Sequence, residues 1–154
     1  MPEAARAKVQ AKLERKRKNS LRALIVSDIH ANLPALEAVL AAAPQYDAVW
    51  NLGDIVGYGA YPNEVVEVVM KLPGIVVRGN HDRACCGNFK YREYLDFNVT
   101  ARYVIDWTRK ALRKENTEWL SRLPRGPLKP LGRKVACVHG SPWTKTNTYS
   151  SRGM

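Results

Sequence analysis

The residues of this chain that can bind metal ions gather at the ends of short β-branched runs. Four such runs are present, at residues 24–26, 48–52, 75–77 and 135–138. The polar residues that follow them, in chain order, are Asp28 and His30, then Asp54, then Asn80, His81 and Asp82, and finally His139. All three histidines of the chain are in this set, whereas histidines without a shared role scatter over surfaces and helix ends. The distribution therefore indicates one site.

The ligand types in this set suit divalent transition metals. Oxygen and nitrogen donors without thiolate are preferred by Mn²⁺, Fe, Zn²⁺ or Ni²⁺. Asp28 and His30 stand two positions apart, so both can reach one ion from the end of a strand. Asp54 follows the second run, which we expect to lie between the first and third strands, so its carboxylate can bridge two ions. Two ions about 3.5–4 Å apart that share a carboxylate and a hydroxide hold a phosphate for in-line attack.

The group after the third run is the most specific signal. An Asp-x-His pair such as Asp28 with His30 arises by chance in about one chain in three of this length. The run Gly79-Asn80-His81-Asp82 specifies four residues and arises by chance in about one chain in a thousand. The prediction of a site therefore depends mainly on this run.

The elements that must position these residues alternate between strand and helix. Helical spacing follows the first run, with Asn32 as the expected N-cap and Pro34 in the first turn, and it resumes at Pro62. A longer helical pattern covers roughly residues 96–113, and a shorter one surrounds Trp119. This alternation predicts an α/β fold with parallel strands. In such a sheet the ligand site lies beyond the carboxyl ends of the strands, where the polar groups fall.

The order of these blocks resembles the calcineurin-like metallophosphoesterases, a small bacterial single-domain branch in particular. The matching blocks are Ser27-Asp28-Ile29-His30, Gly53-Asp54, Gly79-Asn80-His81-Asp82 and Val138-His139-Gly140-Ser141. They are similar to four of the five signature blocks of that family. The resemblance implies an α/β/β/α sandwich of two sheets flanked by helices, with two metal ions at one end. It also implies hydrolysis of a phosphate mono- or diester by a metal-bridging hydroxide.

The resemblance further assigns a role to each matching residue. It implies that Asp28 and His30 bind the first metal, that Asp54 bridges both, and that Asn80 and His139 bind the second. His81 is then no ligand, and its imidazole supports the transition state by protonating the leaving oxygen. Asp82 is expected to orient His81 by accepting its other N–H.

The fifth block of the family, a Gly-His-x-His stretch, has no counterpart after His139. We expect the domain to be the N-terminal portion of a metallophosphoesterase, with the second sheet of the sandwich largely missing and one face uncovered. The alternative is a truncated, inactive remnant. The polar residues from Thr144 onward follow no strand or helix period, and a frameshift near Trp143 is one hypothesis for them.

Charge divides the 154 residues into two expected parts, 1–20 and 21–154. The net charge is +11, and residues 1–20 carry +5 of it in a sequence rich in helix-forming residues. This basic helical extension is either a nucleic-acid-binding arm, through residues 1–18, or a solvated extension.

No apolar run approaches the roughly 20 residues that span a bilayer. The three cysteines form no spaced disulfide framework, so a cytoplasmic location is expected.

Several other residues have two interpretations. Tyr58 either lines the substrate mouth or packs in a loop. Arg78 and Arg83 either hold phosphate oxygens or form salt bridges. Cys85 and Cys86 either form a redox pair or are small buried residues, and the second is expected. Cys137 is expected to pack in the core. The four tryptophans, Trp107 among them, are expected to pack in the core or in loops rather than to form a base-stacking platform, because no regular spacing links them.

Overall fold

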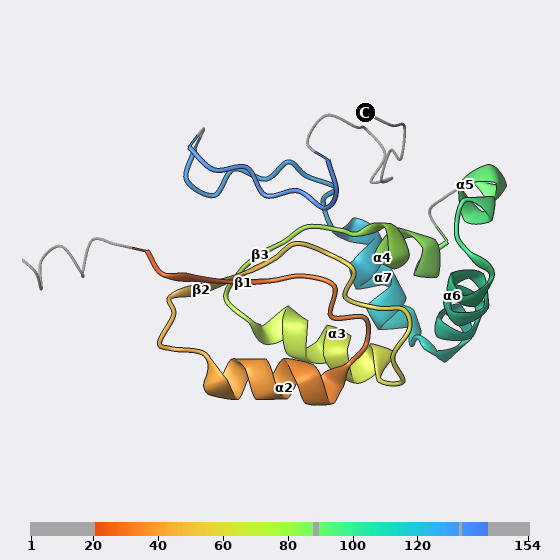
Figure 1. Ribbon diagram of the computed structural model, residues 1–154, viewed down its shortest axis with the longest axis horizontal. Coiled ribbons are helices and arrows are strands. Elements are labelled where there is room, and N and C mark those ends of the chain that lie inside the picture. Colours follow the sequence, from red (N-terminus) through yellow and green to blue (C-terminus); the bar gives the residue numbers. More distant parts are fainter. Residues whose placement is uncertain (1–20, 88–89, 133, 142–154) are drawn as a thin grey trace, which may run out of the picture.

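The computed structural model describes residues 21–87, 90–132 and 134–141 (Figure 1). The basic extension predicted over residues 1–20, and the polar segment from residue 144, lie outside these described residues.

A parallel sheet of three strands forms the centre of the described chain. Its strands are β1 (Ala23–Val26), β2 (Ala48–Asn51) and β3 (Gly74–Val76), hydrogen-bonded in the order β1-β2-β3. Ile25 lies opposite Trp50, which lies opposite Ile75. The first three β-branched runs are therefore strands, as predicted, and β2 is central.

Two helices connect the strands and lie on the same side of the sheet (Figure 1). They are α2 (Leu33–Ala42) and α3 (Pro62–Lys71). The predicted N-cap of α2 is confirmed, because the Asn32 side chain accepts the Ala35 N–H at 3.1 Å. A proline stands in the first turn of each helix, where its missing N–H removes no helical bond.

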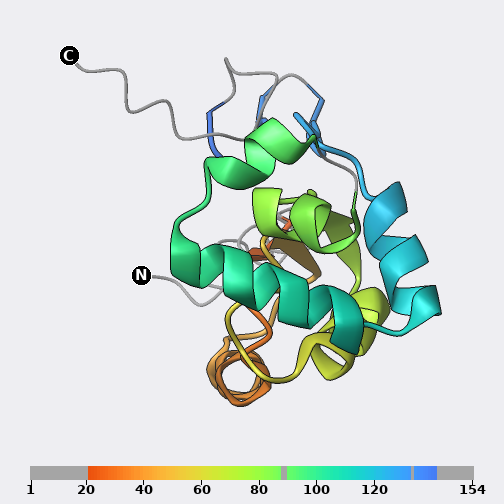
Figure 2. The ribbon, with the colours of Figure 1, turned by 90° about the vertical axis from the view of Figure 1, so that its right-hand side faces the viewer.

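Within the described residues four further helices follow β3, and Figure 2 shows the longest of them crossing one end of the molecule. They are α4 (Asn80–Cys85), α5 (Tyr91–Leu95), α6 (Val99–Ala111) and α7 (Lys114–Arg122). The helix predicted over 96–113 begins at Val99, because the Asn98 side chain caps it by accepting the Ala101 N–H at 2.8 Å. The pattern did not predict α4, whose short sequence has no apolar period.

The two faces of the sheet bury separate apolar clusters. The larger one packs α2, α3, α6 and α7 around fully buried residues such as Ile55, Ile105 and Leu120. The smaller one lies on the other face and contains Trp50 and Cys137. The cysteines are free, and Cys85 and Cys137 are buried, as expected. Trp107, however, is 43% exposed and lies within α6, so it packs neither in the core nor in a loop as expected.

Residues 135–138 do not form the predicted fourth strand. Cys137 makes only an isolated antiparallel bridge with Leu128, in which each residue donates its N–H to the other's carbonyl. The next pair of that ladder would match Val135 with Pro130, which has no N–H to donate. The ladder therefore stops after one bridge.

β1 is one of the two edge strands of the sheet. Ile25 is 58% exposed, although its neighbour Trp50 on the same face is buried. This exposed apolar edge agrees with the predicted incomplete α/β fold. Within the described residues, no helix has the length and apolar character to cross a membrane.

Candidate metal centre

The site forms where the loops after β1, β2 and β3 meet. The loop after β2 bonds to the loop after β1 through several main-chain contacts. The Asp28 N–H donates to the Gly53 carbonyl, and the His30 N–H donates to the Asp54 carbonyl, both at 2.9 Å. Residues far apart in the sequence are thus fixed side by side by backbone hydrogen bonds.

Three of the predicted ligands have left-handed backbone conformations. The φ angles are 54° at Asp28, 50° at His30 and 55° at Asp54. Such angles are uncommon outside glycine, and they concentrate at functional sites, where surrounding structure holds them. Here they turn the three side chains toward one another at the end of the sheet.

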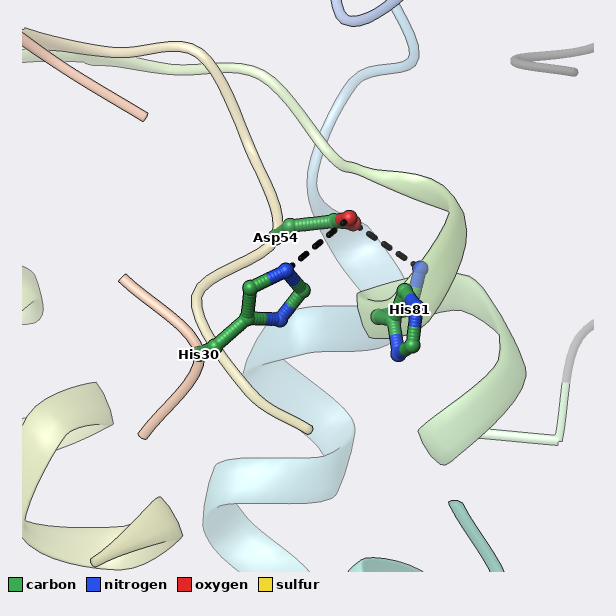
Figure 3. A group of neighbouring side chains, drawn as sticks. All are labelled: His30, Asp54 and His81. Carbon is green, nitrogen blue, oxygen red and sulfur yellow. Dashed lines mark hydrogen bonds and ion pairs between the residues drawn. The ribbon is translucent and has the colours of Figure 1, made fainter. Parts of the chain in front are cut away.

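The Asp54 carboxylate lies at the centre of the cluster (Figure 3). Its Oδ2 atom lies 3.8 Å from Nε2 of His30 and 3.4 Å from Nε2 of His139. Nε2 of His30 lies 3.8 Å from Oδ1 of Asp28. The side chain of Asp54 is only 5% exposed, whereas that of Asp28 is 56% exposed, so the cluster extends from the interior to the surface.

Both histidines present Nε2 to the cluster because the main chain binds their other nitrogen. Nδ1 of His139 lies 2.8 Å from the Leu52 carbonyl oxygen, and Nδ1 of His30 lies 3.2 Å from that of Val56. A carbonyl only accepts, so each Nδ1 carries the hydrogen and donates it. Nε2 of each ring is thus the nitrogen left to face the cluster, and a bound metal ion would take the place of any hydrogen on it.

The third block contributes from the first turn of α4. Oδ1 of Asn80 lies 2.9 Å from Nε2 of His139. The His81 N–H donates to Oδ1 of Asp54 at 2.9 Å, and this contact is drawn in Figure 3. The structure thus brings together the five predicted ligands, Asp28, His30, Asp54, Asn80 and His139.

His81 also belongs to this cluster. One ring nitrogen of His81 lies within 4.8 Å of ligand atoms of His30 and Asp54, so these three could share an ion. Asp28, Asp54 and His139 form a second group with the same limit. The assignment of His81 as a residue that is not a ligand stays a prediction from the resemblance.

The role expected for Asp82 is wrong. Its carboxylate accepts no N–H from the His81 ring, whose Nδ1 has no hydrogen-bond partner among the described residues. It accepts four backbone N–H groups instead: those of Asp54, Ile55, Val56 and Gly79, at 2.7–3.1 Å. Asp82 is fully buried and therefore fastens the β2 loop to the start of α4.

Gly79 is required by the closeness of these two segments. A Cβ atom at this position would lie 2.0 Å from Oδ1 of Asp54 and 2.3 Å from its backbone nitrogen. Both distances are below any tolerated contact, and one of the atoms is backbone. Only glycine allows the Asp54 carboxylate to sit against the start of α4.

The cluster holds charges of both signs. Burial alone would raise the pKa of Asp54, but the hydrogen bond and charge of His139, with lesser help from His81, lower it overall. Burial opposes the charging of His139, yet its contact with Asp54 raises its pKa to about 9. Burial lowers the pKa of His81, and the nearby Asp54 offsets this only in part. The imidazole of His81 is therefore neutral at pH 7.

Tyr58 covers the histidines. Its ring centroid lies 4.8 Å from that of His30 and 4.9 Å from that of His81, and the side chain is about half exposed. Tyr58 therefore lies beside the cluster, and its place at a substrate mouth stays a prediction. Phe97, which the sequence pattern did not single out, packs edge-on against His81 at 5.1 Å.

The two arginines have partners away from the cluster. The buried Arg78 donates to the Ser121 carbonyl in α7. Arg83 forms an ion pair with Glu93 of α5 at 2.8 Å. These contacts favour the salt-bridge interpretation for Arg83 and a packing role for Arg78.

The donor set fits a divalent cation. It combines carboxylates, imidazole Nε2 atoms and an amide oxygen, the ligands that Mn²⁺, Fe, Zn²⁺ and Ni²⁺ accept.

A family model described as calcineurin-like phosphoesterase matches residues 21–153. The chain belongs to this family. The fold and the four signature blocks of the calcineurin-like phosphoesterases thus agree with the match.

Individual relatives share the same part of the chain. An uncharacterized protein of Methanocaldococcus jannaschii, MJ0912, is 42% identical over 122 residues, which are 77% of this chain and 49% of that protein. A metallophosphoesterase from Sphaerobacter thermophilus of known crystal structure is 49% identical, with a TM-score of 0.58 over 70% of this chain and 43% of that one. The chain therefore spans about half the length of these relatives.

A more distant structure shares the fold. The hypothetical protein PH1004 from Pyrococcus horikoshii is 23% identical, with a TM-score of 0.54 over 69% of this chain and 49% of that protein.

Proposed function

We propose that this calcineurin-like phosphoesterase domain hydrolyses a phosphate mono- or diester with the help of two divalent transition-metal ions. The observation that supports it most is the Asp54 carboxylate, toward which His30 and His139 both present Nε2. A buried carboxylate between two such nitrogens can serve two ions at once. The bound ions would supply Lewis acidity toward the phosphate and activate a water for attack.

The residues of the chain divide this work by position. Asp28 and His30 would hold one ion, and Asn80 and His139 the other, with Asp54 shared. The main-chain carbonyls of Leu52 and Val56 fix the two imidazoles before any ion binds. Because these ligands are already oriented, metal binding requires little further ordering of their side chains.

His81 would donate its proton to the leaving oxygen of the ester. Its ring faces the cluster, and Nδ1 makes no hydrogen bond within the described part of the chain. The free imidazole is neutral, but a phosphate group beside it would favour the protonated form. Tyr58 over the two histidines would exclude water from this face.

Metal stoichiometry and turnover test the proposal together. We expect close to two ions per chain after equilibration with Mn²⁺, and hydrolysis of bis-p-nitrophenyl phosphate that is lost on chelation. Asp54→Asn should lower both the stoichiometry and the turnover, the latter at least about 100-fold. Asp47→Asn is the matched control, since Asp47 is half exposed and paired with Arg22.

His81→Asn separates ligation from proton transfer. If His81 donates a proton, this variant should keep the metal stoichiometry while turnover of the diester falls about 100-fold or more. Loss of an ion would instead make His81 a ligand. A chain that binds two ions and hydrolyses no phosphate ester would refute the proposed activity and support the inactive remnant.

A further inference from the structure

Exposed apolar side chains recur at every fourth position from the start of α5 to the end of α6. They are Tyr91, Leu95, Val99, Tyr103 and Trp107. Tyr91 is 75% exposed and Tyr103 is 76% exposed. Single exposed apolar residues are ordinary, but a regular row of them marks an interaction surface.

Within α6, the residues of the row (Val99, Tyr103 and Trp107) lie on the outward side of the helix. The inward side buries Ala101, Ile105 and Thr108 against the core. At 100° per residue, Tyr103 and Trp107 point to the opposite side of the helix. Figure 2 shows this helix crossing the end of the molecule, nearest the viewer. The row therefore faces away from the protein.

The same segment carries the excess positive charge of the domain. Residues 90–114 contain seven basic and three acidic residues. The remainder of residues 21–141 contains nine basic and nine acidic residues and is neutral overall. A surface that combines exposed aromatic rings with concentrated positive charge suits a polyanion that has aromatic groups.

A cavity of about 340 Å³ lies beside the row, between α5 and α6. Tyr91, Tyr94 and Arg109 line it, and the two tyrosine rings stack with centroids 6.4 Å apart and an angle of 25°. Asp106 also lines it, but its carboxylate accepts the Tyr94 hydroxyl at 2.6 Å. Flat rings next to a guanidinium group match the face of a base and the phosphate attached to it.

We propose that the outward face of α5 and α6 binds single-stranded nucleic acid, with bases stacked on Tyr91, Tyr103 and Trp107 and phosphates near Arg109 and Lys110. The binding requires no metal ion and is independent of the proposed hydrolysis. A second copy of the chain fits this face less well, because the pairing would bring two positive segments together.

Fluorescence anisotropy of a labelled oligothymidylate of about 12 nucleotides measures this binding. The full chain is used, with EDTA to prevent hydrolysis. We expect the single strand to bind more tightly than a duplex of the same length, because paired bases cannot stack on the protein. Affinity should also fall steeply as salt is added.

Two double variants separate stacking from charge. Tyr103→Ala with Trp107→Ala should weaken binding by about 10-fold or more and leave the salt dependence unchanged. Arg109→Gln with Lys110→Gln should reduce the slope of log affinity against log salt by about 1.4, since each phosphate contact contributes about 0.7. Trp107→Phe should retain most of the affinity. Met70→Ala and Lys71→Gln are controls, because they alter an exposed apolar and a basic residue of α3.

Several results would overturn the proposal. Oligonucleotide binding that both double variants leave unchanged would place the contact elsewhere, residues 1–18 included. Equal affinity for the duplex would rule out stacking. A dimer in sedimentation that the Tyr103→Ala and Trp107→Ala pair abolishes, without oligonucleotide binding, would assign the face to a second copy. Binding to anionic vesicles but not to the oligonucleotide would assign it to a membrane surface.

Discussion

The Asp82 carboxylate accepts the Asp54 N–H at 2.9 Å and so ties the central residue of the cluster to α4. Asp82 is 0% exposed, and burial, followed by the charge of Asp54, raises its pKa to about 7. Its four backbone hydrogen bonds oppose that rise, because they favour the carboxylate. Asp82 thus holds the β2 loop in place rather than acting on His81.

Replacing Asp82 should therefore destabilise the folded site itself, and not only reduce the rate of hydrolysis. Asp82→Ala leaves four backbone N–H groups without their acceptor, three of them on the β2 loop. We expect a loss of more than about 3 kcal/mol in the free energy of unfolding. Urea denaturation measures it, with the exposed Asp96→Ala as control. A loss below about 1 kcal/mol would contradict the role assigned to Asp82.

Gly79→Ala should disrupt the cluster by steric contact alone. The φ angle of Gly79 is −79°, which alanine adopts readily, but the new Cβ would meet both the side chain and the backbone of Asp54. We expect a loss of about 2 kcal/mol or more, together with weaker metal binding. Thermal unfolding and metal titration check this.

Gly132→Ala is the matched control for that variant. Gly132 has a φ of +66°, but a Cβ atom added there would have no other atom within 4 Å, so only backbone strain of about 1 kcal/mol is expected. Metal binding should stay unchanged. If both glycine variants affect metal binding equally, close packing at Gly79 is not the cause.

Asn63 should contribute to stability through three hydrogen bonds between α3 and the α6–α7 turn. Its amide donates to the Ala111 carbonyl at 2.9 Å, and its oxygen accepts from Arg113 N–H at 2.8 Å and from Asn116 at 3.0 Å. Asn63→Ala should cost about 1–3 kcal/mol in urea denaturation. Asn63→Asp keeps the acceptor and should cost less, whereas the exposed Glu64→Ala should have little effect.

Glu93 should stabilise the fold in a pH-dependent manner. Its pKa lies below the ordinary 4.5, first because it accepts the Lys90 N–H and then because of Arg83. A lowered folded pKa means that the stabilisation is complete above pH 4.5 and is lost as the pH falls through the folded value. Glu93→Gln should cost about 0.5–1 kcal/mol at pH 7. The difference from the unaltered chain should shrink as the pH falls below 4.5, and a difference that grows would contradict this.

The sequence predicts those parts of the fold that depend on apolar periodicity. The runs that became β1, β2 and β3 are short apolar segments, of which β2 is the most buried, and their order places Asp54 in the middle. The strand expected at 135–138 failed because its pairing partner across the turn, Pro130, lacks the N–H that the ladder needs. Such pairings depend on tertiary contacts that a periodic pattern does not contain.

The sequence predicts which residues form the candidate site, but it does not predict the hydrogen-bond network that connects them. Side-chain types indicated the ligands, whereas the function of Asp82 depends on backbone N–H groups, which every residue except proline has. The exposure of Trp107 was missed for a similar reason. Its place in a helical pattern is visible, but the side of the helix that faces the core is fixed by neighbouring elements.

Leu52 and Val56 flank Asp54, and their carbonyls orient the two imidazoles that face it. One stretch of five residues therefore positions three of the proposed metal ligands. A displacement of this stretch would release the carboxylate and both ring orientations in the same event. We accordingly expect the coordination sphere to assemble and fall apart in a concerted manner, with no stable half-built form.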